Sequence, residues 1–180
     1  MHPVMSAAIS FTPNRATARR VLGLLALAWV GATQADSASR LPARVPPAYT
    51  QECASCHTAY PPAFLPAASW RRVMAGLGQH YGTDASLDAT TVRQVADWLQ
   101  ANAGTDRRVR EEPPQDRITR SAWFERKHRK VDAAVWKLPS VKSPANCAAC
   151  HAGADQGVFS DHDLRLPAGL DARQRRAWQD

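Results

Sequence analysis

The 180-residue sequence contains only four cysteines, and all four lie in two short motifs, so no thiol remains for a disulfide framework. The chain lacks the runs of β-branched residues that would form the strands of a βαβ unit. After residue 35, no segment is long and apolar enough to cross a membrane. An extended basic stripe with interleaved aromatic residues is also missing, so the composition does not indicate nucleic-acid binding.

The four cysteines belong to two copies of Cys-X-X-Cys-His, at residues 53–57 and 147–151. This pentapeptide is the attachment site of a c-type haem: two thiols add to the vinyl groups, and the adjacent histidine binds the iron. The sequence therefore predicts two covalently bound haem c groups. The predicted attachment points and first axial ligands are Cys53, Cys56, Cys147 and Cys150, and His57 and His151.

Two other kinds of site use the same residue types. A zinc site would take all four cysteines as ligands, but it would leave both adjacent histidines unexplained. A thioredoxin-type redox dithiol would require a βαβ context, which the sequence does not offer. Haem attachment explains both the cysteines and the histidines, and it is the interpretation that we adopt.

The first 35 residues have the features of a secretory signal peptide. Three arginines form a basic region, an apolar stretch from Val21 to about Ala32 follows, and small residues precede Asp36. The stretch is too short to span a bilayer, although it could anchor the chain at a membrane if cleavage failed. Cleavage would lower the formal net charge from +7 to +4, because it removes three basic residues and no acidic one. We predict a periplasmic bacterial protein without a membrane span.

The residues that remain after cleavage are few for two haem groups. Domains of about 70 residues bury little apolar surface and often need a metal or another link for stability. We therefore predict an all-α fold with two small haem-centred, cytochrome c-like domains and extensive loop. These domains would comprise residues 36–105 and 106–180, divided within the charged, proline-containing segment 105–117.

Apolar residues recur at helical spacing in three segments of the chain. They predict helices at residues 68–81, at 88–103 with Asp88 as N-cap, and from Ser121 to about Val131. Shorter helices are expected at residues 53–57 and 171–178. Proline-rich segments predict an extended lead-in before the first motif and an irregular loop after it.

Each motif supplies only one axial ligand, so each iron needs a second ligand or keeps an open position. The candidates after residue 35 are Met74, His80, His128 and His162. His80 lies 23 residues after His57, and His128 lies 23 residues before His151. Both are on apolar faces of expected helices, so we predict them as the distal ligands. A crossed pairing between the two halves remains open at this point.

The other two candidates have simpler interpretations. Met74 is on the same expected helix as His80, and we interpret it as a packing residue. His162 lies in a polar loop between two aspartates, where a solvated imidazole is expected. It is the reserve ligand for the second haem.

The sequence resembles the bacterial dihaem cytochrome c family over most of residues 49–160. The resemblance is carried by residues 49–57, Tyr60-Pro61-Pro62, Leu65-Pro66, Trp70, His80-Tyr81-Gly82, Trp123-Phe124, Lys127-His128, Val135-Trp136 and residues 143–147. It implies a periplasmic, all-α electron carrier with bis-histidine haems. It also implies redox protein partners, either a small monohaem cytochrome with an oxygen-binding iron or a membrane b-type cytochrome.

Two histidines on each iron would leave no position open to a substrate, so we expect single-electron transfer and no catalysis. One alternative is a dihaem electron-transfer subunit of a larger reductase, such as periplasmic nitrate reductase. Its two motifs would lie closer together than Cys53 and Cys147 do. A haem peroxidase is the other alternative, and it would require one iron to lose its distal ligand.

Basic residues cluster beside His128 and in the segment between the predicted domains. They are Arg126, Lys127, Arg129 and Lys130, and Arg107, Arg108 and Arg110. Such clusters are either solvated surface or a docking surface for an acidic partner, where complementary charge raises the encounter rate.

Overall fold

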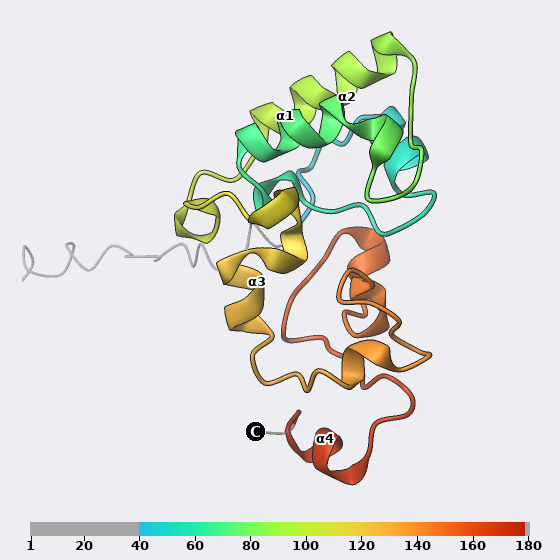
Figure 1. The fold of residues 1–180 in the computed structure, drawn as a ribbon, viewed down its shortest axis with the longest axis vertical. Coiled ribbons are helices and arrows are strands. Elements are labelled where there is room, and N and C mark those ends of the chain that lie inside the picture. The colour runs from blue at the N-terminus through green and yellow to red at the C-terminus, as the bar shows by residue number, and fades with distance from the viewer. Residues whose placement is uncertain (1–39, 179–180) are drawn as a thin grey trace, which may run out of the picture. The chain divides into compact units, whose positions relative to one another are not determined.

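The computed structural model describes residues 40–178 (Figure 1). Along these residues the chain forms helices and turns joined by loops, and no strand. Three isolated β-bridges occur, Arg40 with Val158, His80 with Thr83, and His151 with Leu164. The all-α prediction is confirmed. The predicted signal peptide lies outside the described residues.

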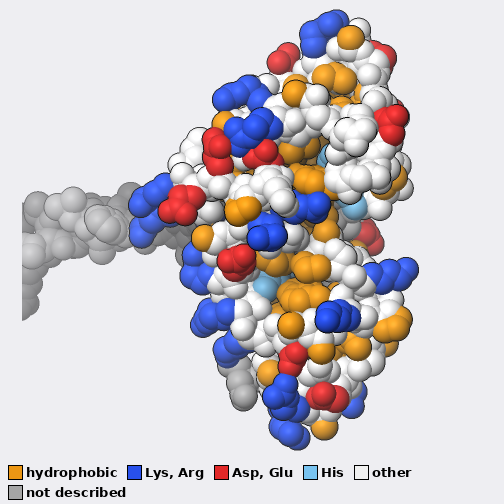
Figure 2. All heavy atoms as spheres, in the orientation of Figure 1, with side chains coloured by type: hydrophobic (Ala, Val, Ile, Leu, Met, Phe, Trp, Pro, Cys, Tyr) orange, Lys and Arg blue, Asp and Glu red, His pale blue; other side chains and the backbone are white. Residues whose placement is uncertain are grey.

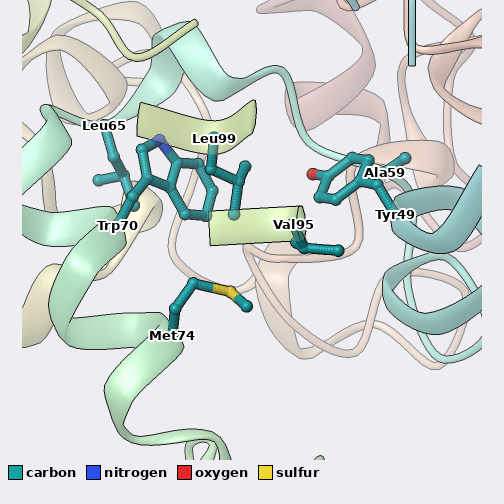
Figure 3. Packing of buried hydrophobic residues seen from close by; sticks show 7 residues of the cluster. All are labelled: Tyr49, Ala59, Leu65, Trp70, Met74, Val95 and Leu99. Carbon is teal, nitrogen blue, oxygen red and sulfur yellow. The ribbon is translucent and has the colours of Figure 1, made fainter. Parts of the chain in front are cut away.

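Helices α1 (Ala67–Ala75) and α2 (Ala89–Ala101) pack side by side over the largest cluster of buried side chains (Figure 1). Figure 3 shows its members, Tyr49, Ala59, Leu65, Trp70, Met74, Val95 and Leu99. The Trp70 indole N–H donates to the Pro62 carbonyl at 2.7 Å, which satisfies its one buried polar group. Cys53 also packs against this cluster, so the first motif rests on the α1–α2 core.

The helix predicted for residues 68–81 is shorter in the structure. α1 ends at Ala75, and Leu77–Gln79 forms a separate 3₁₀ turn. Gly76 and Gly78 explain the early end, because glycine costs about 1 kcal/mol more than alanine inside a helix. His80 consequently lies beyond the helix, in a loop.

α2 begins where the sequence predicts. The Asp88 carboxylate caps it, accepting backbone N–H groups two and three residues further on at 2.9 and 3.1 Å. The helix ends at Ala101, before the glycine expected to stop it. Gly104 has another role: its N–H donates to the Leu65 carbonyl at 2.9 Å. A Cβ at this position would lie 2.5 Å from the Ala63 carbonyl oxygen, so the close approach requires glycine.

α3 (Ala122–Lys127) begins at the predicted N-cap, Ser121, whose hydroxyl accepts the Phe124 N–H at 3.1 Å. It ends at Lys127, with His128 as its C-cap, so the prediction of a helix to about Val131 was too long. Repulsion among the basic residues that follow one another here, including an i, i+4 pair, disfavours further helical turns. The short helix predicted near the C-terminus is present as α4 (Ala172–Arg176), with a capping box between Asp171 and Gln174.

Two further clusters of buried side chains lie around the second motif. One joins Phe64, Ala154 and Phe159, with Tyr60, Ile118, Trp123, Cys147 and Ala148 packed against them. The other joins Val135, Val141 and Leu170. The first of these takes residues from both sides of residue 105. The described residues belong to one compact unit, and the division into two haem-centred domains stays a prediction.

Within residues 40–178, no helix combines the length and the apolar character that crossing a bilayer would require.

Candidate haem-binding site

Two hydrogen bonds, one from Tyr49 and one from His57, hold the first motif in place. A π-helical turn at Tyr49–Cys53 leads into it, and the buried Tyr49 donates its hydroxyl to the Tyr60 carbonyl at 2.6 Å. This bond ties the loop after the motif to the turn before it. The His57 Nδ1–H donates to the Thr58 carbonyl at 2.8 Å, which fixes the ring and leaves Nε2 as the ligating atom.

His80 begins a tight turn that faces this motif. The Thr83 N–H donates to the His80 carbonyl at 3.0 Å. Between them, Tyr81 (φ 51°) and Gly82 (φ 100°) both adopt left-handed conformations, as in a type I′ turn. The non-glycine residue in this region is strained, so other contacts must stabilise it.

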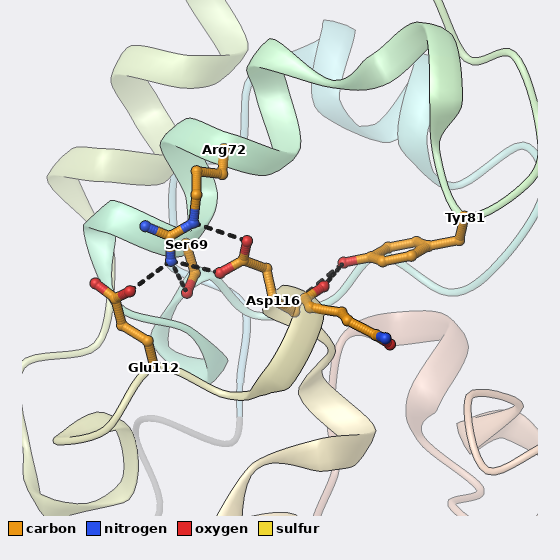
Figure 4. Close-up of polar contacts among 6 residues, drawn as sticks. Ser69, Arg72, Tyr81, Glu112 and Asp116 are labelled. Carbon is orange, nitrogen blue, oxygen red and sulfur yellow. Dashed lines mark hydrogen bonds and ion pairs between the residues drawn. The ribbon is translucent and has the colours of Figure 1, made fainter.

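The stabilising contacts come from the segment that includes residues 112–117 (Figure 4). The Tyr81 hydroxyl donates to the Gln115 carbonyl at 3.2 Å and the Asp116 carbonyl at 3.0 Å. Arg72 of α1 holds the same segment through a two-point contact with the Asp116 carboxylate, at 2.6 and 2.9 Å, and a third with Glu112 at 2.6 Å. These hydrogen bonds from Arg72 lower the pKa of Asp116 below its usual value. Arg72, Glu112 and Asp116 form a cluster, the Arg72 cluster, that thus supports the turn carrying His80.

The second motif is a 3₁₀ turn, Cys147–Ala149, followed by backbone bonds from Cys150 and His151 to the Cys147 carbonyl at 3.1 and 2.8 Å. The His151 Nδ1–H donates to the Ser160 carbonyl at 2.9 Å. As in the first motif, this bond orients the ring and leaves Nε2 available.

His128 is placed by the end of α3. Its Nδ1–H donates to the Phe124 carbonyl at 2.9 Å, one helical turn back. Its ring stacks on the Phe124 ring at 3.9 Å between centroids and 21° between planes, and Trp136 lies 5.9 Å away. The distal candidate of the second motif is therefore fixed by the backbone and by two aromatic rings.

The structure brings the four histidines together in two pairs. The ring centroids of His57 and His80 are 6.3 Å apart, and those of His128 and His151 are 6.2 Å apart. Two imidazoles on opposite sides of one metal have centroids roughly 6 Å apart, since each metal–nitrogen bond is about 2 Å and each centroid lies about 1 Å behind its nitrogen. Both separations match that value, so each pair fits one iron atom. Each pair also joins a motif histidine to the distal candidate of the same half.

The electrostatics of the distal candidates favour the neutral imidazole that binds metals. Burial lowers the pKa of His80, and the neighbouring His57 and Arg117 lower it further. Burial also lowers the pKa of His128, helped by His151 and Lys127 and partly opposed by the bond to Phe124.

The thiols differ from those of a redox-active dithiol. Burial raises the pKa of Cys53 to about 11 and that of Cys147 to about 12. A redox dithiol lowers the pKa of its attacking thiol instead. The thiol environment thus argues against dithiol chemistry.

Met74 and His162, the other ligand candidates, lie in different surroundings. Met74 is buried in the α1–α2 core, in keeping with a packing role (Figure 3). The His162 side chain is 87% exposed, and its nearest ionic neighbour is Asp161 at 3.7 Å.

Sequence reasoning missed several residues that contact the histidines. Tyr60 stacks on His57 with centroids 4.8 Å apart, and Phe159 lies 6.3 Å from His151. The resemblance includes Tyr60, but no pattern marks Phe159 in its polar surroundings. Figure 2 shows histidine side chains open to the surface next to hydrophobic ones, as expected where a porphyrin would cover apolar surface.

Comparisons with known proteins find similarity to dihaem cytochromes c. The family model of the dihaem cytochromes c matches residues 49–159. The chain is similar to DHC purified from Rhodobacter sphaeroides, at 42% identity and a TM-score of 0.56, over 64% of this chain and 98% of that one. It is also similar to a diheme cytochrome type c from Shewanella baltica OS155, at 35% identity and a TM-score of 0.60, over 69% and 96% of the two chains. Among curated proteins, none matches the chain.

Proposed function

The chain belongs to the dihaem cytochrome c family, whose members carry electrons on two covalently bound haem c groups, and from this we propose that it is a periplasmic bis-histidine electron carrier. His57 and His80 would bind one iron, and His151 and His128 the other. The observation that carries the proposal is the pair of centroid separations, 6.3 and 6.2 Å. Cys53, Cys56, Cys147 and Cys150 would hold the two porphyrins covalently.

The haems supply one-electron chemistry between ferrous and ferric iron, and the protein determines their position, burial and potential. With one pair of histidines for each iron, the four side chains would hold both irons and would leave no coordination position for substrate or oxygen. Histidine as the second ligand favours a lower potential than methionine does. Backbone carbonyls at Thr58, Phe124 and Ser160 orient three of the imidazoles. These roles fit a carrier better than an enzyme.

The predicted signal peptide supports a periplasmic location, because it would export the chain before its haems are attached. A periplasmic electron carrier needs other redox proteins as partners. The resemblance implies a monohaem cytochrome or a membrane b-type cytochrome. A role as a subunit of a larger reductase would show as stable co-purification with a catalytic chain.

The proposal is tested on the protein loaded with both haems, by spectropotentiometry and low-temperature EPR, together with the variants His80→Met and His128→Met. Each variant should raise the potential of one haem only and change one set of low-spin signals. The ring planes meet at 28° in the first pair and at 70° in the second. Near-parallel rings should give a rhombic spectrum and steeply crossed rings a highly anisotropic one, so the signals can be assigned.

Carbon monoxide supplies the control. The reduced wild-type protein should not bind it, whereas an iron with an open or weakly held position would. Rapid binding by the wild type would contradict closed coordination and favour the peroxidase alternative. If neither variant changed an axial signal, His80 and His128 would not be the ligands.

A further inference from the structure

Tyr60 lies three residues after the first motif and contacts both motifs. Its ring stacks on the His57 imidazole, with centroids 4.8 Å apart and planes at 23°. Its hydroxyl donates to the Ala145 carbonyl at 2.7 Å, across 85 residues of sequence. Ala145 is two residues before Cys147, and Tyr60 packs in the same cluster as Cys147 and Ala148. One side chain thus contacts the first iron ligand and the segment that opens the second motif.

Phe159 extends this contact to the second iron ligand. Its ring centroid lies 6.4 Å from that of Tyr60 and 6.3 Å from that of His151. Phe64 packs edge-on against Phe159 at 5.3 Å and keeps it buried. The rings of His57, Tyr60, Phe159 and His151 therefore form a series with successive centroid separations of 4.8, 6.4 and 6.3 Å, within the range of aromatic pairs, and they connect the two motifs on their proximal sides.

We propose that Tyr60 couples the two haem sites: it fixes their relative position and, with Phe159, forms the packed path between the two proximal histidines. This inference rests on the proposed function, since it takes His57 and His151 as iron ligands. Tyr60 lies outside both motifs, and through this coupling it determines how fast electrons pass from one site to the other.

Two physical arguments support a coupling role. Electron tunnelling weakens steeply with distance and is faster through packed atoms than across a gap, so a residue that fixes the separation also fixes the rate. The Ala145 contact is a hydrogen bond between segments that are 85 residues apart in sequence, and such bonds restrict the relative motion of the segments that they join.

The step is a transfer of one electron from the reduced site to the oxidised one; no bond forms or breaks, and no proton moves. Burial raises the pKa of Tyr60 above its usual value, so the hydroxyl keeps its proton and remains a donor.

The experiment uses the full protein with both haems, as wild type, Tyr60→Leu and Tyr60→Phe. One readout is the rate of inter-haem electron exchange after flash reduction by a single electron. The other is the magnetic interaction between the two ferric irons, measured by pulsed EPR, which reports their separation and its spread. Trp98→Phe is the matched control, because the Trp98 ring pairs with Tyr49 and, among the described aromatic contacts, with none of the four histidines.

Tyr60→Leu should slow the exchange several-fold and broaden the distribution of iron separations. Tyr60→Phe keeps the ring and loses only the bond to Ala145, so it should broaden the distribution with a smaller loss of rate. Trp98→Phe should change neither. Should Tyr60→Leu fail to take up both haems, Tyr60→Phe decides the question: a wild-type rate with a wild-type distribution overturns the proposal. Carbon monoxide binding by the wild type would contradict bis-histidine ligation separately, without altering the measured separation.

Discussion

His57, His128 and His151 each donate Nδ1–H to a backbone carbonyl, at 2.8, 2.9 and 2.9 Å. Such a bond keeps the proton of the imidazole on Nδ1 and fixes the direction in which Nε2 points. Among the described residues, none forms a hydrogen bond with the His80 ring. His80 depends instead on the turn that carries it, so the two distal candidates are fixed by different means.

Phe124 offers a test of the second pair at the level of one residue. Phe124→Leu keeps the backbone carbonyl that accepts from His128 and removes the ring that stacks on it at 3.9 Å. Aromatic pairs contribute about 1 kcal/mol beyond the area that they bury, so the free energy of unfolding should fall by at least that amount. The EPR signals and potential of the second haem should shift, while those of the first stay in place.

The matched control is Leu99→Val. Leu99 is also buried, in the α1–α2 core, and belongs to neither of the two clusters around the second motif. It should lower stability to a similar extent without a selective shift at the second haem. A shift of the first haem in Phe124→Leu would contradict the pairing of His128 with His151.

Much of the candidate site was predictable from sequence at this scale. The two motifs name six candidate residues, four thiols for attachment and two histidines for iron ligation, and the scarcity of other candidates pointed to His80 and His128. The contacts that orient the rings were not predictable. Thr58 and Ser160 act through backbone carbonyls, which every residue has, and Phe159 is placed by packing between segments remote in sequence.

At the scale of elements, helix starts were easier to predict than helix ends. Asp88 and Ser121 each cap a helix with a side chain, and such caps are visible in sequence. The ends depend on tertiary contacts. α1 stops five residues before His80, and the turn that begins at His80 is held by a segment that lies more than thirty residues further along the chain.

The Arg72 cluster gives the prediction at this scale. Arg72→Gln removes the ion pairs with Asp116 and Glu112 and should loosen residues 112–117, which hold the Tyr81 hydroxyl (Figure 4). Because the Arg72 side chain is 50% exposed, global stability should fall only slightly. Hydrogen exchange at residues 80–83 should quicken, and carbon monoxide should gain access to the first haem alone.

The pH dependence provides an internal check. The pKa of Asp116 is lowered in the folded protein, so its contribution to stability is complete above the usual carboxyl pKa and is lost as the pH falls through the lowered value. The stability difference between wild type and Arg72→Gln should thus be constant above about pH 5 and shrink below about pH 4. Arg93→Gln, at an exposed α2 position, should change neither exchange nor ligand access; equal effects of the two variants would refute the positioning role.

At the scale of the whole molecule, the fold class followed from sequence, but the distribution of the core did not. Helical spacing identified the α1–α2 core. The cluster of Phe64, Ala154 and Phe159 brings together residues from both predicted domains, and no periodic pattern connects them. In a chain with little secondary structure, cores assembled from loop residues escape methods that rely on periodicity.

The basic residues around His128 give the prediction at this scale. Lys127 pairs with Asp161 at 3.0 Å, whereas Arg126 and Lys130 form no ion pair with another described residue and are exposed. Electrons enter or leave through a surface near a haem, and local charge changes the rate of encounter more than affinity. Reversing Arg126 and Lys130 to glutamate should slow oxidation of the reduced protein by ferricyanide, an anion, and speed oxidation by a cationic cobalt(III) complex.

The salt dependence of the rate and a second double variant distinguish a local charge effect from an effect of net charge. The rate with ferricyanide should fall as salt rises in the wild type and depend less on salt in the double variant, because screening acts on the charges that were reversed. Reversing Arg71 and Arg93, exposed on α1 and α2, makes the same change in net charge elsewhere. Equal slowing by the two double variants would mean that only net charge matters. Slowing confined to Arg126 and Lys130 would identify the surface beside His128 as the point of electron exchange.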